Sequence, residues 1–215
     1  MTSLPHRPKP LVRVVDDDPT VLKALQTYLE LADFAVHTYE GAEAFLEKDD
    51  PETPGCVILD VRMPRMSGIE LHGELLRRKI DLPVIFLSGH GDIEMAVAAV
   101  KAGAKTFLVK PPKMEELARV IAEAIEENAE HRAKRRDYLS LRQDVEKLTP
   151  TETLVARMVV KGITNAVIAD ALGMAERTVK AHRAAVFEKL GVENALELSD
   201  FFHEIDDYSR EFEAK

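Results

Sequence analysis

Polar side chains that could do chemistry follow four short apolar runs in the first half of this 215-residue chain. Three consecutive aspartates follow one run, and an aspartate, a serine and a lysine each follow another. The carboxyl ends of parallel strands meet in one crevice of a doubly wound sheet. We therefore expect these side chains to lie together: Asp16, Asp17, Asp18, Asp60, Ser88 and Lys110.

Clustered carboxylates at such a crevice raise one another's pKa unless a cation neutralises them. A hard divalent ion meets that need, and Mg2+ fits best because it binds a few carboxylates, a backbone carbonyl and waters. An aspartate oxygen, here that of Asp60, can also attack phosphorus to form an acyl phosphate, with the metal and Lys110 offsetting the charge on the phosphoryl oxygens. These residue types predict a magnesium-dependent phosphoryl acceptor.

The elements that must position these residues alternate between β-branched runs and amphipathic helical stretches, a pattern typical of βα units. Right-handed crossovers place the helices on both faces of the sheet. The expected fold is α/β, with a five-stranded parallel doubly wound sheet. Strands are expected at residues 11–15, 35–38, 56–59, 84–87 and 106–109, and helices at 19–31, 42–47, 67–78, 93–102 and from 114 onward.

The motifs at these strand ends resemble the receiver domain of CheY-like response regulators. They are Val14-Val15-Asp16-Asp17-Asp18, Leu59-Asp60-Val61-Arg62-Met63-Pro64, Ser67-Gly68, Ser88-Gly89 and Lys110-Pro111. The resemblance implies a flavodoxin-like strand order, a cis peptide between Lys110 and Pro111, and Asp60 as the phosphoacceptor. The other implied roles are Mg2+ binding by Asp16, Asp17, Asp60 and the backbone carbonyl of Arg62, phosphoryl contact by Ser88 and Lys110, and a switch formed by Ser88 and Phe107.

Some features favour other interpretations. Pro112 stands where relatives often carry phenylalanine, which puts the packing after the fifth strand in doubt. A haloacid-dehalogenase-like phosphatase also forms an aspartyl phosphate, but it needs a second aspartate at the position of Arg62. No GxGxxG turn or Gly-Lys-Ser/Thr phosphate loop follows the first strand. Aspartates also serve as simple helix caps, as Asp18 before Pro19 would. Four matching strand ends in the right order favour the receiver.

A helical pattern without proline or glycine covers residues 115–146 and predicts a last helix that runs on into a linker. Asn128 and Arg135 interrupt any clean heptad repeat. The alternative is a dimer contact between the linker helices of two chains, along the apolar positions Ile121, Ile125, Tyr138, Leu141 and Val145.

The strand pattern disappears beyond Leu148, and four short helical segments follow, separated by Gly162, Gly173 and Gly191, which predicts a compact all-α domain of four helices. One helix, capped by a threonine, is expected to end near residue 161, a second spans about 164–172, and a third ends at residue 190. A helix, a glycine-bearing turn and a second helix can place a recognition helix in the major groove of DNA. An ordinary helical bundle is the alternative.

Further motifs resemble the LuxR-type helix-turn-helix: Leu148-Thr149, Gly162, Asn165, Ile168-Ala169, Leu172-Gly173, Arg177-Thr178-Val179-Lys180, His182-Arg183 and Lys189-Leu190. Both halves together resemble the NarL/FixJ class, and the run Ser88-Gly89-His90-Gly91-Asp92 is nearest to FixJ-like members. The resemblance implies that Lys180, Ala181 and Ala184 face the DNA groove and that Thr178, His182 and Arg183 lie close to phosphate. Lys180 and Arg183 rank first, and His182 could instead be structural.

Departures from the LuxR-type pattern concern DNA affinity and dimerisation. Ala166 and Val167 replace a usual lysine and glutamate, so non-specific affinity for DNA is expected to be lower than is usual for the family. The segment 194–202 matches the family's last helix, in which Phe201 and Phe202 are expected to be core residues, with dimer contacts as the alternative. Residues 206–215 are expected to form an acidic, flexible tail.

Bulk properties set the remaining expectations. The net charge of the chain is −9, but the excess of acidic residues falls before residue 129 and after residue 199. The segment expected to contact DNA therefore does not carry this negative charge. No apolar run approaches the roughly 18 residues of a membrane span, so a cytoplasmic protein without membrane contact is expected. The single cysteine, Cys56, is expected to be a buried thiol. The expected divisions are a receiver at 1–128, a linker at 129–146, a DNA-binding domain at 147–205 and the tail.

The expected function combines these parts. A sensor histidine kinase donates a phosphoryl group to Asp60, and phosphorylation promotes homodimerisation and binding to double-stranded promoter DNA, with RNA polymerase as a further candidate partner. No enzymatic activity is expected beyond the chain's own phosphorylation and dephosphorylation. The alternatives are a phosphorylation-independent DNA-binding protein and a protein-interaction module.

Overall fold

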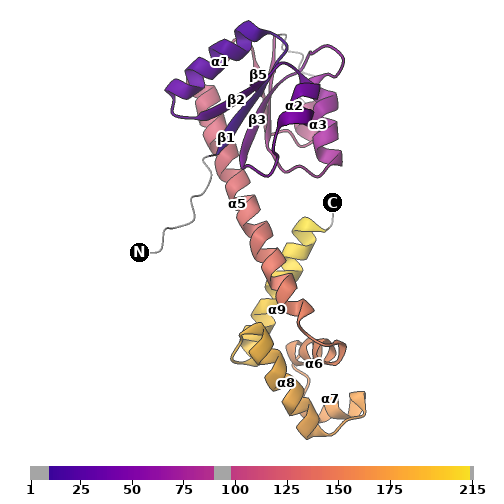
Figure 1. The fold of residues 1–215 in the computed structure, drawn as a ribbon. Helices are drawn as coiled ribbons and strands as arrows, with labels where there is room; N and C mark the ends of the chain where they lie inside the picture. Colours follow the sequence, from indigo (N-terminus) through magenta and orange to yellow (C-terminus); the bar gives the residue numbers. More distant parts are fainter. Residues whose placement is uncertain (1–9, 90–97, 214–215) are drawn as a thin grey trace. The chain divides into compact units, whose positions relative to one another are not determined.

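The computed structural model describes residues 10–89 and 98–213, which fall into two units, Met1–His131 and Arg132–Lys215 (Figure 1). In these described ranges no helix is long and apolar enough to cross a membrane. The first unit contains β1 (Leu11–Val15), α1 (Pro19–Leu31), β2 (Ala35–Tyr39), α2 (Ala42–Lys48), β3 (Gly55–Asp60), α3 (Gly68–Arg77), β4 (Val84–Ser88) and β5 (Thr106–Val109). Helix α5 (Met114–Glu146) crosses the unit boundary, and α6 (Pro150–Val160), α7 (Asn165–Leu172), α8 (Glu176–Leu190) and α9 (Ala195–Phe212) follow.

The five strands form one parallel sheet in the order β2-β1-β3-β4-β5. This confirms the predicted α/β architecture with doubly wound order. The predicted strand bounds differ from the observed bounds by at most one residue at each end. The predicted helix at 93–102 lies partly outside the described residues, as do His90, Gly91 and Asp92, but its last turn is helical up to residue 101.

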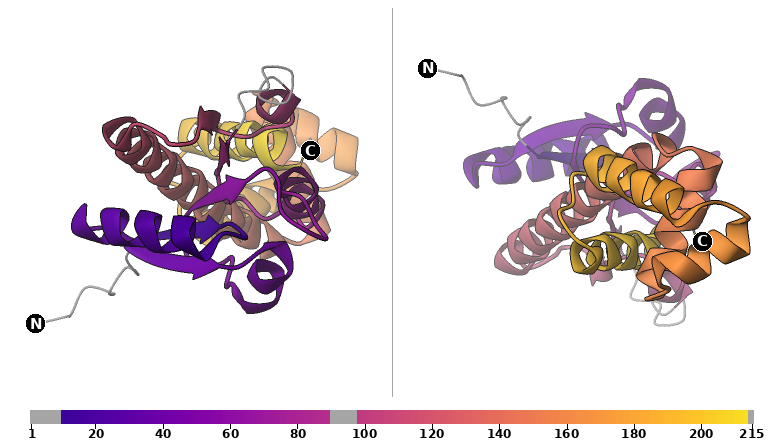
Figure 2. Two further views of the ribbon diagram at one scale, coloured as in Figure 1. Left: turned by 90° about the horizontal axis from the view of Figure 1, so that it is seen from above. Right: turned by 90° about the horizontal axis from the view of Figure 1, so that it is seen from below.

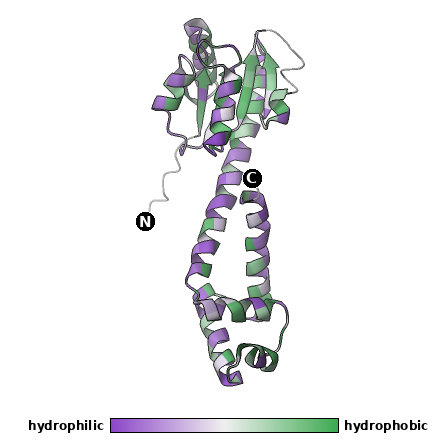
Figure 3. Cartoon of the chain, turned by 90° about the vertical axis from the view of Figure 1, so that its right-hand side faces the viewer, coloured by the Kyte–Doolittle hydropathy of each residue, from purple (hydrophilic) through white to green (hydrophobic). Residues whose placement is uncertain are grey.

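Successive strand residues face opposite sides of the sheet, so the first unit has two cores. One core packs α1 and α5 against side chains such as Val14 and Ile58, and the other packs α2 and α3 against Val15 and Leu59. Figure 2 shows these helices on opposite faces of the sheet, and Figure 3 shows the strands as mainly hydrophobic. Cys56 lies in the first core, where burial raises the pKa of its thiol to about 12, as expected for a structural thiol.

A buried charge network ties the loop after α2 to β1. The side chain of Arg13 is fully buried, and its Nε lies 2.8 Å from Asp49 Oδ1. Arg13 also donates to the carbonyl oxygens of Asp50 and Thr53, and the Tyr39 hydroxyl donates to Asp49 at 2.6 Å. The guanidinium is thus satisfied inside the protein, as a buried charge must be.

Asn128 connects α5 to the rest of the first unit through two hydrogen bonds. Its side chain is 2% exposed, accepts a hydrogen bond from Gly55 N at 3.1 Å and donates to the Asp81 carbonyl at 2.7 Å. Asn128, which interrupts the heptad pattern in the sequence, therefore has a structural role, because its side-chain amide pairs with two backbone groups.

The second unit packs α6 to α9 around a core that includes Val155, Ile168, Val179 and Phe202. The expectation that Phe202 is a core residue is confirmed, and Phe201 is partly buried against the same core. Glu152 completes a capping box with Thr149 at the start of α6 and also accepts a hydrogen bond from Lys189 at 2.6 Å.

Residues 206–212 belong to α9, so the expectation of a flexible tail is wrong for them. Tyr138 of α5 is 4% exposed, stacks on Phe212 at 5.7 Å between ring centroids, and lies 6.2 Å from the ring of Tyr208. Its hydroxyl donates to Glu213 at 2.5 Å, and Arg142 reaches the same carboxylate at 2.9 Å. We call these five residues the C-terminal clasp. Tyr138 is buried by these contacts within its own chain, so it is not available for the predicted dimer contact.

Candidate functional site

The ammonium group of Lys110 joins two buried carboxylates at the carboxyl end of the sheet. Its Nζ lies 2.5 Å from Asp16 Oδ2 and 2.5 Å from Asp60 Oδ1. Asp16 follows β1, Asp60 ends β3 and Lys110 follows β5, so three strand ends converge as the sequence predicts. Asp16 and Asp60 are 3% and 7% exposed, so Lys110 offsets one of two negative charges that are largely shielded from water.

Burial sets the protonation behaviour of this pocket. It raises the pKa of Asp60 above its ordinary value, although the hydrogen bonds from Lys110 and from Arg62 N act in the opposite direction. Burial alone would lower the pKa of Lys110, but the two carboxylates outweigh it and the net shift is upward. Lys110 is therefore held as a cation beside an aspartate whose anionic form is incompletely stabilised.

The other predicted receiver residues lie around this pair. Ser88 ends β4 and is 2% exposed, and its carbonyl oxygen accepts from Lys110 N at 2.8 Å. Phe107 of β5 is half-buried and packs against the core that contains α2 and α3. Arg62 N donates to Asp60 Oδ2 at 2.8 Å. The peptide between Lys110 and Pro111 is cis, which confirms the expectation.

The carboxylates only partly form the predicted metal site. Within residues 10–89 and 98–213, no group of three or more His, Cys, Asp or Glu side chains is placed to hold a metal ion. The structure brings Asp16 and Asp60 together, whereas Asp17, in the bend after β1, is exposed. Two buried carboxylates at neighbouring strand ends are nevertheless hard oxygen donors of the kind that Mg2+ binds, so these residues fit that ion.

Gly68 allows α3 to begin directly against the end of β3. A Cβ atom at this position would lie 2.0 Å from the carbonyl oxygen of Asp60, where no side chain fits. Ser67 caps the helix with Glu70 in a reciprocal capping box. The sequence contained this signal as the Ser67-Gly68 motif, but its steric reason is visible only in three dimensions.

Helices α7 and α8 form the predicted helix-turn-helix. Gly173 ends α7 in the left-handed conformation, with φ 63°, and α8 begins three residues later. Lys180, Ala181 and Ala184 are exposed, and Lys180 Nζ lies 3.6 Å from Glu176 Oε1. Thr178 and His182 are half-buried. The three residues predicted to face the groove thus lie together on the solvent-exposed side of α8.

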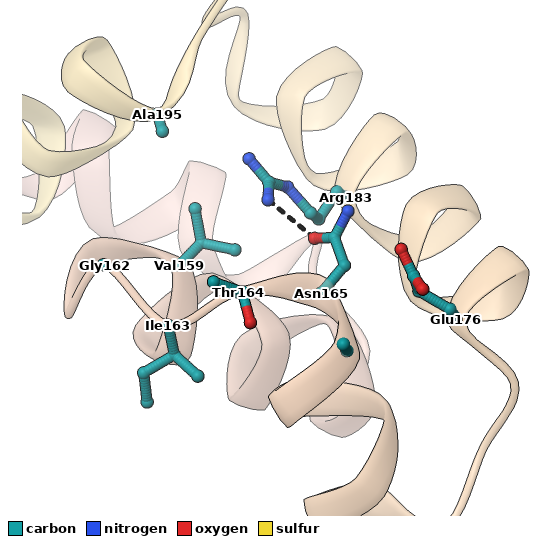
Figure 4. Close-up of a pocket in the computed structure, with 9 residues that line it drawn as sticks. Val159, Gly162, Ile163, Thr164, Asn165, Glu176, Arg183 and Ala195 are labelled. Atoms are coloured by element: carbon teal, nitrogen blue, oxygen red, sulfur yellow. Dashed lines mark hydrogen bonds between the residues drawn. The ribbon is translucent and has the colours of Figure 1, made fainter.

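Arg183 does not share that exposed side. It is half-buried, its Nη1 donates to Asn165 Oδ1 at 2.7 Å, and its Cζ lies 5.7 Å from the ring centroid of Phe187. Figure 4 shows its side chain directed from α8 toward Asn165, at the edge of a hollow that Glu176 and Val159 also line. Arg183 and Lys180 therefore lie in different environments, although both ranked first among the predicted DNA contacts.

Comparisons with known proteins match both units. Residues 12–122 match the family of response regulator receiver domains, and residues 146–202 match the luxR family of bacterial regulatory proteins. The transcriptional regulatory protein FixJ of Rhizobium meliloti is 42% identical over 183 residues, which cover 83% of this chain and 88% of FixJ. Nodulation protein W of Bradyrhizobium diazoefficiens is 36% identical over 190 residues, covering 88% of this chain and 84% of that protein.

Solved structures agree with these matches. The response regulator StyR is 42% identical and superposes with a TM-score of 0.84, over 91% of this chain and 99% of the StyR chain. Full-length FixJ from B. japonicum is 31% identical with a TM-score of 0.56, over 93% and 98% of the two chains. The chain therefore belongs to the two-component response regulators that join a receiver domain to a LuxR-type DNA-binding domain, and it is a transcriptional regulator of that family.

Proposed function

We propose that Asp60 accepts a phosphoryl group from a sensor histidine kinase and that this modification controls dimerisation and DNA binding through α8. The observation that carries the proposal is Lys110, whose ammonium group bridges buried Asp16 and Asp60. An Asp60 oxygen bonds to phosphorus while the bond between phosphorus and the kinase imidazole breaks, and the electron pair of that bond returns to the imidazole nitrogen.

The pocket residues have distinct roles in this proposal. Lys110 offsets charge on the phosphoryl oxygens, and Arg62 N–H, already 2.8 Å from Asp60 Oδ2, orients the attacking carboxylate. Asp16 and Asp60 would hold Mg2+, with Asp17 and the Arg62 carbonyl at the rim, and bound Mg2+ supplies positive charge to the transferring group. Ser88 would bind the phosphoryl group, and Phe107 would respond by packing further into the core.

The outcome of the switch is also part of the proposal. Lys180, Ala181 and Ala184 would face the groove, where the Lys180 ammonium would lie near both base edges and a phosphate, while Thr178 and His182 would lie near phosphates. Phosphorylation would stabilise one of two receiver states and favour a homodimer on promoter DNA. The protein would act in the cytoplasm and would reach RNA polymerase through its position on the promoter.

Phosphorylation with a small donor tests the proposal. Acetyl phosphate with Mg2+ should add one phosphoryl group to the intact chain, as measured by mass spectrometry, and Asp60→Asn should abolish the addition. Asp207→Asn, which changes an exposed aspartate of α9, is the matched control and should be labelled like the wild type. Undiminished labelling of Asp60→Asn would defeat the assignment. DNA affinity that does not depend on labelling would favour a phosphorylation-independent regulator.

A further inference from the structure

Arg183 lies on the core side of α8 by its position in the helix. At 100° per residue, it falls about 40° from Val179 and within about 60° of Val186, and both valines are fully buried. Lys180 and Ala184 lie about 100° and 140° from Val179 around the helix, and both are exposed. A cation in the buried stripe of a helix needs partners inside the protein.

The protein supplies two partners that suit a guanidinium group. Asn165 begins α7 and accepts a hydrogen bond from Arg183 Nη1 at 2.7 Å. Phe187, one turn further along α8, presents its ring 5.7 Å from Arg183 Cζ, within the range of a cation–π contact. The planar guanidinium can satisfy both at once, whereas a lysine ammonium lacks this fork geometry.

These contacts link the two helices of the helix-turn-helix. The hydrogen bond crosses from the middle of α8 to the first turn of α7, where the Thr164 side chain makes no capping hydrogen bond. The angle between α7 and α8 determines how the exposed side of α8 enters a groove. We infer that Arg183 is a positioning residue that fixes α8 against α7 through Asn165 and Phe187, and that it does not itself contact DNA. This inference rests on the proposed role of α8 as the recognition helix.

Salt dependence of DNA binding separates positioning from contact. Two probes are needed: a duplex that the wild-type full chain selects from a random-sequence pool, and a scrambled duplex of equal length. Each phosphate contact contributes about −0.9 to the slope of log K against log salt. Arg183→Gln should keep the wild-type slope on both duplexes and weaken binding to the selected duplex roughly tenfold, with little change on the scrambled one. Lys180→Gln, the matched control on the exposed side, should reduce the slope by about 0.9.

Two further variants make the result decisive. Arg183→Lys keeps the charge but loses the fork geometry, so it should lose specificity as Arg183→Gln does. Asn165→Ala should produce the same loss, and combining it with Arg183→Gln should add little, because both remove one link. Circular dichroism verifies that each variant is folded, and the selected-to-scrambled affinity ratio is a readout that a loss of stability alone would not change.

Other outcomes would overturn the inference. If Arg183→Gln reduces the slope by about 0.9 and Arg183→Lys restores it, Arg183 contacts phosphate. If Asn165→Ala leaves the affinity ratio unchanged, the link to α7 has no positioning role. Failure of the wild type to bind either duplex, or an unchanged slope in Lys180→Gln, would instead refute the proposed recognition surface of α8, which keeps the two failures distinguishable.

Discussion

Replacing Gly68 by alanine tests how closely α3 must approach the end of β3. The new Cβ atom would lie 2.0 Å from the carbonyl oxygen of Asp60 and 3.0 Å from Leu59 Cγ. Contacts below 3.0 Å essentially never occur for real Cβ atoms, so the first turn of α3 and the end of β3 must separate by about 1 Å. Because the obstructing atom belongs to the backbone, we expect a cost near the upper end of overpacking, about 3 kcal/mol.

The same helix provides a matched control. Gly73 lies in the interior of α3, and a Cβ atom there would meet no other atom within 4 Å. Gly73→Ala should therefore stabilise the receiver by about 0.5–1 kcal/mol, the usual gain in a helix interior. One added methyl group in one helix is thus expected to have opposite effects at two positions.

Urea unfolding followed by hydrogen exchange of the β1 and β3 peptides measures the stability of the receiver alone. A spectroscopic signal from the whole chain would combine the unfolding of two units. With a urea dependence of about 1–3 kcal/mol per molar, Gly68→Ala should lower the midpoint by roughly 1–3 M. A midpoint equal to that of the wild type, or an equal loss in Gly73→Ala, would refute the steric argument.

Three further substitutions probe other parts of the chain. Arg13→Met should cost about 3–5 kcal/mol in urea unfolding because it leaves buried Asp49 without its cation; a cost below about 1 kcal/mol would contradict this. Hydrogen bonds from Lys189 and from the backbone N–H of Thr149 lower the pKa of Glu152 from 4.5 to about 2. This stabilisation is complete above pH 4.5 and is lost as the pH falls toward 2, so Glu152→Gln should flatten that part of the stability profile; an unchanged profile would count against it. Phe212→Leu should remove about 0.5–1.5 kcal/mol of aromatic pairing and speed amide exchange in residues 134–146, whereas unaltered exchange would argue against the clasp.

Much of the receiver could be predicted because its signals are local and periodic. Strand runs alternate with amphipathic helices, and each predicted site residue stands at or directly after the carboxyl end of a strand, so the topology brings Asp16, Asp60 and Lys110 together. The turn at Gly173 was predicted from the position of the glycine between two helical segments. The cis peptide after Lys110 was predicted only through the resemblance to receiver domains.

Features that depend on contacts between distant residues were not predicted. Asn128 contacts residues 73 and 47 positions away, and the Tyr138 hydroxyl bonds to Glu213, 75 positions along the chain. The acidic C-terminal residues suggested a flexible tail, because nothing local showed that Phe212 would stack on Tyr138. The place of Arg183 was also not predicted: its charge and the LuxR-type resemblance suggested DNA contact, although its helical spacing from Val179 is consistent with the core side.

DNA affinity measured with and without phosphorylation tests the central claim most directly. The full chain is titrated onto its selected duplex before and after treatment with acetyl phosphate and Mg2+, with Asp60→Asn treated in parallel. We predict tighter binding only for the treated wild type that carries one phosphoryl group. An equal gain in Asp60→Asn, or no gain in fully phosphorylated wild type, would contradict the claim that modification of Asp60 controls DNA binding.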